Sequence, residues 1–178
     1  MIKKKIIQSL YSGLGGHANV VFSLLDSDFS SKYINVLVFF GVERTLADYL
    51  KKASDLGIKN YSLQKKQKKY RQSIREFHEI LMNENPDVVI VHNSELIYAA
   101  VKYKKVAKST KIIFVEHEPN HSKTFFEKII SKYAAKKADT VICLNQSYKL
   151  ELTEKYNYKA NVVVVPNGLN TDRFQRNT

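Results

Sequence analysis

The sequence contains a single cysteine, Cys143, among its 178 residues. No disulfide can therefore form within the chain, and no metal cluster can be built from cysteines. Cys143 follows Val141 and Ile142 in an apolar run, which predicts a small buried core residue rather than a reactive thiol.

Long apolar segments are also missing. No run approaches the ~20 residues that a helix needs to span a bilayer. Only two apolar residues, Ile6 and Ile7, separate the charged N-terminus from Gln8, a pattern unlike that of a signal peptide. We therefore expect a cytoplasmic protein, either soluble or peripheral on the inner face of the cell membrane.

Acidic residues are scarce relative to basic ones: 17 Asp and Glu stand against 29 Lys and Arg, for a net charge of +12. Such an excess favours polyanionic partners, namely nucleic acid, anionic lipid or phosphorylated substrates, although many surface lysines serve solubility alone. The lysines are scattered and no nucleic-acid-binding motif occurs, so we expect no nucleic-acid partner.

Short β-branched runs alternate with longer helical patterns, which is typical of a parallel sheet covered by helices on both faces. Runs such as Val88–Val91 and Val162–Val165 are apolar at every position, as central parallel strands are. We predict one α/β domain, a Rossmann-like open parallel sheet of about seven strands. These strands are Lys5–Ser12, Tyr33–Phe40, Asn60–Leu63, Asp87–His92, Lys111–Glu116, Thr140–Leu144 and Asn161–Val165.

The segments between the strands predict six helices. The third has Ile74, Phe77, Ile80 and Leu81 at helical spacing and ends at Asn85–Pro86, so it should cover the sheet. The predicted helices are Ala18–Leu25, Thr45–Leu56, Lys68–Asn83, Leu96–Ala107, Thr124–Lys137 and Tyr148–Tyr156.

Ligands of open parallel sheets bind beyond the carboxyl ends of the strands, so the residues there are candidates for a site. Gly13–His17 follow the first strand, where glycine N–H groups at a helix start suit a phosphate or carboxylate. Three of these candidates, Ser94, Asn145 and Ser147, are also good helix N-caps. The other segments are His92–Glu95, Glu116–His121, Asn145–Ser147 and Pro166–Gly168.

His117 is the strongest single candidate because it follows a buried strand and lies between two carboxylates. A core histidine held by Glu118 is the alternative. A zinc site with His121 is disfavoured because the intervening proline prevents the two histidines from sharing a helix turn. We expect no bound metal.

Gly13, Gly15 and Ala18 also satisfy the dinucleotide-binding pattern G-x-G-x-x-A. The acidic residue expected at the end of the second strand is missing, since Glu43 comes late. An NAD-binding domain would also leave His117 and Pro166–Gly168 unexplained.

The order of these motifs resembles the group 1 (family 4) glycosyltransferases, retaining enzymes of the GT-B fold, over essentially the whole chain. Gly15–Gly16 resembles the glycine pair of the family's first loop. The other matching segments are Pro86–Asn93, similar to PDVVHxHN; Ile113–His117, similar to vvtvH; Ala138–Asn145, similar to ADaviavS; and Val165–Phe174, similar to vIPNGvDterF.

The resemblance implies that residues 1–170 form the acceptor-side N-terminal domain and that residues 171–178 begin a linker to a nucleotide-sugar-binding domain. It implies a nucleotide-diphosphate sugar as donor substrate, no cofactor, and a glycan or lipid-linked acceptor in bacterial surface polysaccharide synthesis. On its own this half should have little or no transfer activity. A sugar-nucleotide epimerase, which shares the two-half architecture, remains an alternative.

By the same resemblance, His117 would contact the transferred sugar and support the charge of the departing diphosphate. Gly15 and Gly16 would approach the donor diphosphate or the acceptor. Asn145 and Asn170 stand where the family usually has Ser and Asp. The remaining candidates for donor or acceptor binding are His17, His92, Asn93, Glu118, Asn120, Asn145, Asn167 and Gly168.

Two basic segments, Lys65–Arg71 and Lys123–Tyr133, could attach the protein to an anionic membrane, as relatives with lipid-linked acceptors do. The alternative is that the apolar residues of the second segment, Phe126, Ile129, Ile130 and Tyr133, pack on the sheet, since they repeat at helical spacing.

Overall fold

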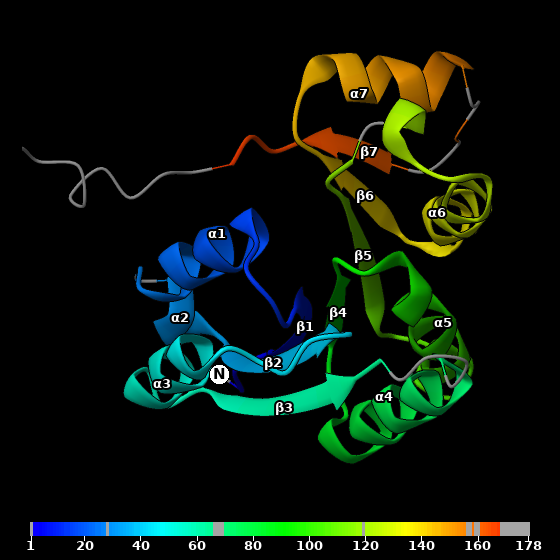
Figure 1. The fold of residues 1–178 in the computed structure, drawn as a ribbon. Helices are drawn as coiled ribbons and strands as arrows, with labels where there is room; N and C mark the ends of the chain where they lie inside the picture. The colour runs from blue at the N-terminus through cyan, green and yellow to red at the C-terminus, as the bar shows by residue number, and fades with distance from the viewer. Residues whose placement is uncertain are drawn as a thin grey trace, which may run out of the picture.

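The computed structural model describes residues 2–27, 29–65, 70–118, 120–155, 158 and 161–167. These residues form a seven-stranded parallel sheet in the order β3-β2-β1-β4-β5-β6-β7 (Figure 1). The strands are β1 Lys5–Tyr11, β2 Ile34–Gly41, β3 Lys59–Gln64, β4 Val88–Val91, β5 Lys111–Glu116, β6 Thr140–Cys143 and β7 Asn161–Val164.

Helices cover both faces of the sheet, as predicted (Figure 1). They are α1 Gly16–Leu25, α2 Phe29–Lys32, α3 Ala47–Asp55, α4 Tyr70–Glu84, α5 Ile97–Val106, α6 Phe125–Lys137 and α7 Gln146–Leu150, with short helical turns η1 Ser94–Leu96, η2 Asn120–Ser122 and η3 Glu151–Lys155. No described helix is both long enough and apolar enough to cross a lipid bilayer.

All seven predicted strands are present, and each bound lies within one residue of the prediction. The four-residue helix α2 was not predicted. Two helix caps were also wrong, because Ser147 lies inside α7 and Asn93 rather than Ser94 is the N-cap of η1. Asn145 does cap α7: its side chain accepts a hydrogen bond from the Tyr148 N–H at 2.9 Å.

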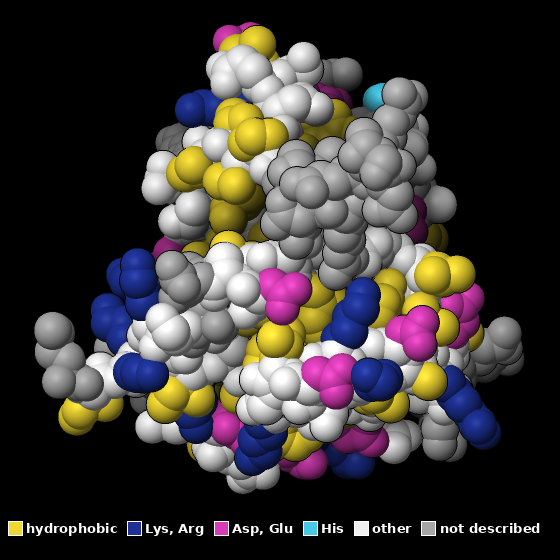
Figure 2. All heavy atoms as spheres, turned by 90° about the vertical axis from the view of Figure 1, so that its left-hand side faces the viewer, with side chains coloured by type: hydrophobic (Ala, Val, Ile, Leu, Met, Phe, Trp, Pro, Cys, Tyr) yellow, Lys and Arg dark blue, Asp and Glu magenta, His cyan; other side chains and the backbone are white. Residues whose placement is uncertain are grey.

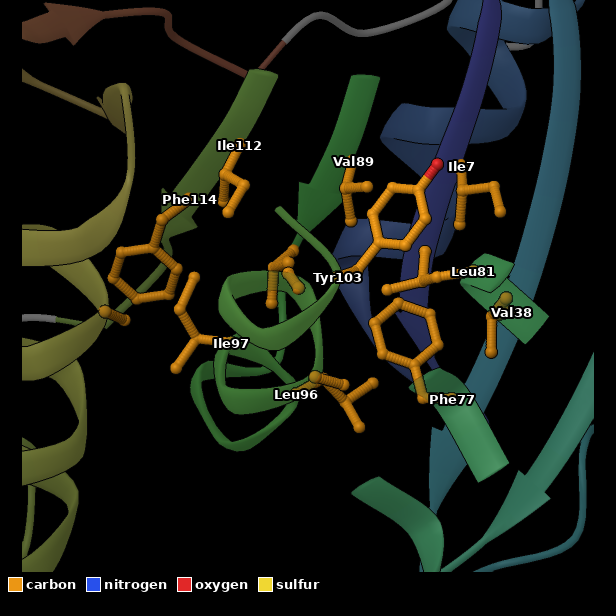
Figure 3. Packing of buried hydrophobic residues seen from close by; sticks show 14 of the residues in the cluster. Ile7, Val38, Phe77, Leu81, Val89, Leu96, Ile97, Tyr103, Ile112 and Phe114 are labelled. Atoms are coloured by element: carbon orange, nitrogen blue, oxygen red, sulfur yellow. The ribbon is translucent and has the colours of Figure 1, made fainter. Parts of the chain in front are cut away.

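The sheet separates two apolar clusters, and β2 contributes to both. Leu37 and Phe39 pack in the cluster under α1 and α3, whereas Val36, Val38 and Phe40 pack in the larger cluster on the opposite face. This alternation follows from the two-residue period of a strand. The larger cluster includes Phe77 and Leu81 of α4 and Ile97 and Tyr103 of α5 (Figure 3). Cys143 is buried in it, as predicted.

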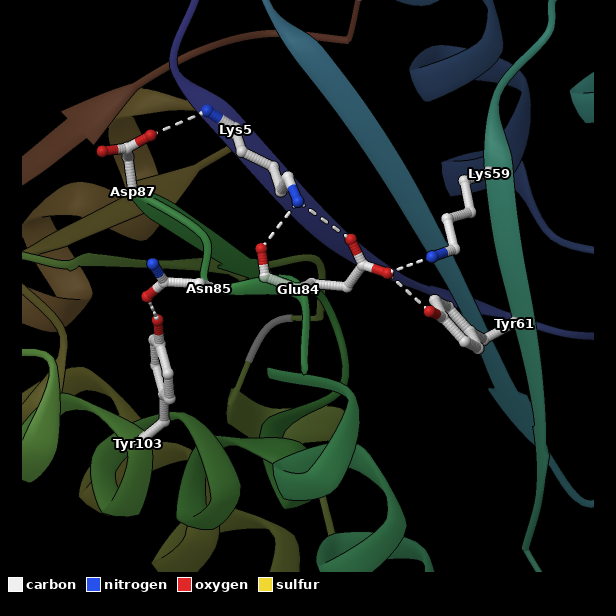
Figure 4. Close-up of polar contacts among 7 residues, drawn as sticks. All are labelled: Lys5, Lys59, Tyr61, Glu84, Asn85, Asp87 and Tyr103. Carbon is white, nitrogen blue, oxygen red and sulfur yellow. Dashed lines mark hydrogen bonds and ion pairs between the residues drawn. The ribbon is translucent and has the colours of Figure 1, made fainter. Parts of the chain in front are cut away.

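At the amino ends of the strands, Glu84 connects α4 to the sheet (Figure 4). Its carboxylate accepts hydrogen bonds from Lys5 Nζ at 3.0 Å and Tyr61 Oη at 2.5 Å, and pairs with Lys59 Nζ at 2.5 Å. Burial alone would raise the pKa of Glu84, but Lys59, Tyr61 and Lys5 together lower it to about 2. The carboxylate is therefore fully ionised and fully partnered at neutral pH.

The predicted packing of α6 is partly wrong. Phe126 and Ile129 are 76% and 49% exposed, because the helix turns its small residues Ser131, Ala134 and Ala135 toward the interior instead. Small side chains let the helix backbone approach the sheet closely, and Phe126 and Ile129, which lie on the opposite side of the helix from Ser131, remain outside the core. The helix begins with a capping box between Thr124 and Glu127.

Candidate functional site

A cavity of about 470 Å³ lies beyond the carboxyl ends of β1, β4 and β5, which are neighbours in the sheet. Its wall combines the loop after β1, the end of β3, the loops after β4 and β5, and the first half of α6. The residues that line it are Tyr11, Leu14, Gly15, His17, Lys65, His92, Asn93, Ser94, Glu95, Phe114, Glu116, His117, Glu118, Lys123, Glu127, Ile130 and Ser131.

Three histidines meet in this cavity, one from each of the three neighbouring strand ends. His92 Nδ1 lies 2.7 Å from His117 Nε2, within hydrogen-bonding distance. The His17 ring lies close to His117, with 4.1 Å between ring centroids, and the His92 ring meets His117 edge to edge, with 5.0 Å between centroids. His117 is thus held between two imidazoles.

All three imidazoles are neutral at physiological pH. Burial and then the neighbouring His17 lower the pKa of His117 to about 4. Burial, His117 and His17 lower the pKa of His92 to about 3. Burial also lowers the pKa of His17, although the Glu118 carboxylate opposes that change. A neutral imidazole can donate one hydrogen bond and accept another, so the cluster suits hydroxyl recognition.

Two ion pairs border the histidines. Lys123 Nζ contacts the Glu116 carboxylate, and both side chains are almost completely buried. Burial raises the pKa of Glu116, while Lys123 opposes that shift. Lys65 Nζ pairs with Glu95 at 2.6 Å, linking the end of β3 to η1. The cavity therefore has fixed charges of both signs on its wall.

The loop after β1 contains three glycines, and the space around Gly13 differs from the space around Gly15 and Gly16. A Cβ atom on Gly13 would collide with the Glu43 carboxylate and the Tyr11 ring, so packing explains that glycine. A Cβ on Gly16 would meet no atom within 4 Å, and one on Gly15 would make ordinary contacts only. Gly15 is extended, with φ −167°, a conformation that any residue adopts. The described part of the fold requires no glycine at these two positions.

The structure brings together about half of the predicted site residues. Gly15, His17, His92, Asn93, His117 and Glu118 line the cavity, and Gly16 begins α1 next to it. Asn145 and Asn167 do not line it, since they follow the more distant strands β6 and β7. The side chain of Asn120, together with all of Gly168 and Asn170, lies outside the described residues.

The contacts of His117 bear on its two alternative roles, a core histidine held by Glu118 and a zinc ligand together with His121. Its ring partner is His92 rather than Glu118, whose backbone N–H is 3.5 Å from the Glu116 carboxylate. His121 is exposed and does not line the cavity. Within the described ranges, no three His, Cys, Asp or Glu side chains converge in a metal-binding arrangement.

The sequence placed Glu116 in a candidate segment at a strand end, but it did not indicate Lys123 as part of the cavity wall or as the partner of Glu116. A carboxylate at the last position of a buried strand needs a nearby cation, and Lys123 is the first lysine after it. That signal identifies the ion pair, but only the fold shows that it faces the histidines.

The model of Glycosyltransferase Family 4 matches residues 14–173. The chain belongs to this family. Among curated proteins, none is similar enough in sequence to count as a relative.

Solved structures of two kinds resemble this family member. A glycosyltransferase from Rickettsia africae is 18% identical, with a TM-score of 0.63, over 97% of this chain and 45% of its own. A putative UDP-N-acetylglucosamine 2-epimerase from Listeria monocytogenes is 19% identical, with a TM-score of 0.66, over 92% and 45%. HepE from Anabaena, in complex with UDP, is 9% identical, with a TM-score of 0.71, over 97% and 46%.

The chain spans about half the length of each of these structures. At such identities the likeness establishes the fold alone, and the neighbours that share this fold include a transferase and an epimerase. The family match separates the two kinds in favour of the transferases.

Proposed function

We propose that this chain is the acceptor-side half of a retaining glycosyltransferase. The complete enzyme transfers a sugar from a nucleotide-diphosphate sugar to a glycan or lipid-linked acceptor, in bacterial surface polysaccharide synthesis. The cavity beyond β1, β4 and β5 forms one wall of the active-site cleft, and a second domain supplies the other. This half alone has little or no transfer activity.

The observation that carries the proposal is the convergence of His117 with two glycines that the fold itself does not need. Gly15 and Gly16 lie at the N-terminus of the ten-residue helix α1, whose first turn has no acidic side chain. Backbone N–H groups there, close to the positive end of the helix dipole, suit a diphosphate that approaches without side-chain obstruction. HepE binds UDP, which supports a nucleotide sugar as the donor.

His117 acts in this proposal as a neutral hydrogen-bond donor to a hydroxyl of the transferred sugar. The contact strengthens as the sugar gains oxocarbenium character and the diphosphate leaves. Asn93 and Glu118 border the acceptor from the loops after β4 and β5.

The test is a transfer assay with the protein that carries both domains, using a panel of UDP-, GDP- and ADP-sugars. We expect turnover of one donor, reduced ~100-fold or more by His117→Ala, the size expected for a lost transition-state contact. His121→Ala is the matched control, because it makes the same change four residues away on an exposed side chain outside the cavity, and should leave turnover unchanged.

Three other outcomes contradict the proposal in different ways. Equal loss in both variants means that the effect is not specific to the cavity. Conversion of a UDP-sugar to its epimer without an acceptor means that the protein is an epimerase. Turnover of no donor, with NAD binding by this chain, means that the glycine loop holds a dinucleotide.

We also propose that α6 attaches this half to an anionic membrane, where a lipid-linked acceptor would lie. Phe125 and Phe126 are 72% and 76% exposed at the start of the helix, and Ile129 is 49% exposed one turn later. Lys128 and Lys132 follow at helical spacing. Exposed aromatic tips beside cations suit the interfacial region of a bilayer.

Cosedimentation with vesicles tests this attachment. Binding should require phosphatidylglycerol in a phosphatidylcholine vesicle, and should weaken at least ~10-fold in Phe125→Ser/Phe126→Ser, since burying one aromatic side chain is worth about 1.5–3 kcal/mol. Met82→Ser, which alters an exposed apolar residue of α4, is the control. Equal binding by all three proteins argues against α6 as the anchor.

A nucleic-acid partner finds no support on the face that carries α1, α2 and α3. Basic and acidic side chains are interspersed there and form no continuous basic surface (Figure 2).

A further inference from the structure

His92 is held tightly behind His117. Its backbone N–H donates a hydrogen bond to Ser9 Oγ of β1 at 3.2 Å, which fixes the start of the loop after β4. Its ring meets the His117 ring edge to edge, and the two ring planes differ by 19°. The ring nitrogens have different surroundings: Nδ1 lies 2.7 Å from His117 Nε2, whereas Nε2 is buried and has no hydrogen-bond partner among the described residues.

These surroundings determine where the protons lie. Between His92 Nδ1 and His117 Nε2, one nitrogen must donate and the other must accept. If His92 carried its proton on Nε2, a buried N–H would have no acceptor, which is rarer in proteins than a buried acceptor without a donor. The proton of His92 therefore belongs on Nδ1, and His117 Nε2 accepts it.

The consequence for His117 follows directly. Because Nε2 is the acceptor and the ring is neutral, the proton of His117 lies on Nδ1. Nδ1 is also the ring nitrogen that His92 leaves free to meet a ligand. The hydrogen bond at one imidazole nitrogen thus decides what the other offers, as is general for histidine pairs and triads.

We propose that His92 is a positioning residue that fixes His117 in its Nδ1-protonated form, so that His117 presents an N–H donor, and no lone pair, to a hydroxyl of the sugar substrate. This inference rests on the proposed function of His117, but the tautomer itself does not. The low pKa of about 4 agrees with it, because a second proton on His117 Nε2 would remove the acceptor that His92 uses.

The charged groups around the pair are compatible with two neutral rings. His17 faces His117 from α1, and the Glu116 carboxylate is paired with Lys123. Lys65 is paired with Glu95. Glu118 is an exposed carboxylate on this wall, and its negative charge acts to raise the pKa of His17.

The first experiment measures ¹⁵N chemical shifts of the histidine ring nitrogens in this chain at neutral pH, without any ligand. We expect a protonated Nδ1 and an unprotonated Nε2 for His117. Leucine at position 92 has a similar volume but no donor, so His92→Leu should give the mixture of tautomers of a free imidazole. His92→Asn places an amide N–H close to the position of Nδ1 and should retain the wild-type tautomer.

The second experiment measures steady-state transfer by the two-domain protein. His92→Leu should lower kcat about 10- to 100-fold, as loss of an orienting partner commonly does. KM should change less than about threefold, and His92→Asn should recover most of kcat. A merely structural role predicts instead that both variants lose activity in parallel with their stability.

Each outcome has a definite meaning. An Nε2-protonated His117 in the wild type, or an unchanged tautomer in His92→Leu, overturns the proposal even if a variant folds poorly. The expected tautomers in a protein that transfers no sugar would leave the positioning role intact and refute the proposed function instead.

Discussion

Glu84 and His92 lie at opposite ends of the same sheet, and they differ in whether their buried polar atoms have hydrogen-bond partners. Both carboxylate oxygens of Glu84 have partners, which come from β1 and β3. Of the five buried side-chain polar atoms without a hydrogen-bond partner in the described residues, three belong to His17, His92 and Asn93. Since such atoms cost stability, three of them around one cavity indicate that this end of the sheet serves binding at some cost in stability.

Glu84→Gln tests the stabilising end and should have the largest effect on stability. Removing the negative charge leaves Lys5 and Lys59 without their shared anion. The free energy of unfolding should fall by about 2 kcal/mol at neutral pH, which is less than for a fully buried pair because Lys59 is 61% exposed. Urea unfolding measures the change. Glu79→Gln, on the exposed side of the same helix, is the control and should change stability by less than about 0.5 kcal/mol.

The pH dependence of unfolding separates the two ends further. The pKa of Glu84 is lowered from 4.5 to about 2, so its contribution is complete above pH 4.5 and is lost as the pH falls toward 2. His117, whose pKa is lowered from 6.5 to about 4, favours the fold above pH 6.5 and loses that contribution as the pH falls toward 4. Glu84→Gln should remove only the more acidic of the two losses; removal of both would contradict the separation.

Gly16→Ala tests the binding end and should have the smallest effect on stability. Its Cβ meets no atom of the described protein, so the free energy of unfolding should change by less than about 0.5 kcal/mol. Transfer by the two-domain protein should nevertheless fall ~10-fold or more, because the added methyl group obstructs the diphosphate.

Gly13→Ala supplies the matched contrast. There the Cβ would displace the exposed Glu43 side chain and press on the Tyr11 ring, so stability itself should fall by about 1 kcal/mol, the lower end for an added methyl group because Glu43 can move. If Gly16→Ala were as destabilising as Gly13→Ala, or left transfer unchanged, then Gly16 would have no role at the diphosphate.

Much of the fold was predictable because the strand sequences have few alternatives. Val88–Val91 is apolar throughout, and β1 to β6 each end at, or within two residues of, a polar residue or glycine, so the strand bounds could be predicted closely. The helix α2, with four residues, is too short to show a helical period. The inward face of α6 was misjudged because small residues, whose burial no hydrophobic period signals, make the contact with the sheet.

The site was predictable as a location but not as a set of contacts. Histidines 17, 92 and 117 follow the strands β1, β4 and β5, and the predicted type of sheet places strand ends along one edge. The hydrogen bond between His92 and His117 depends on the register of β4 with β5, in which Val91 lies opposite Phe114. No local pattern encodes that register, so the sequence suggested a role for His92 at the acceptor and not behind His117.

The strand order also bears on how a nascent chain acquires its function. β1, β2 and β3 are neighbours in the sheet and come from residues 5–64, while β4 to β7 come from residues 88–164. Within the sheet the two groups meet only where β1 pairs with β4. His17 belongs to the first group and His92 and His117 to the second, so the three imidazoles come together only when the two halves dock, and a signal from that cluster would report this docking.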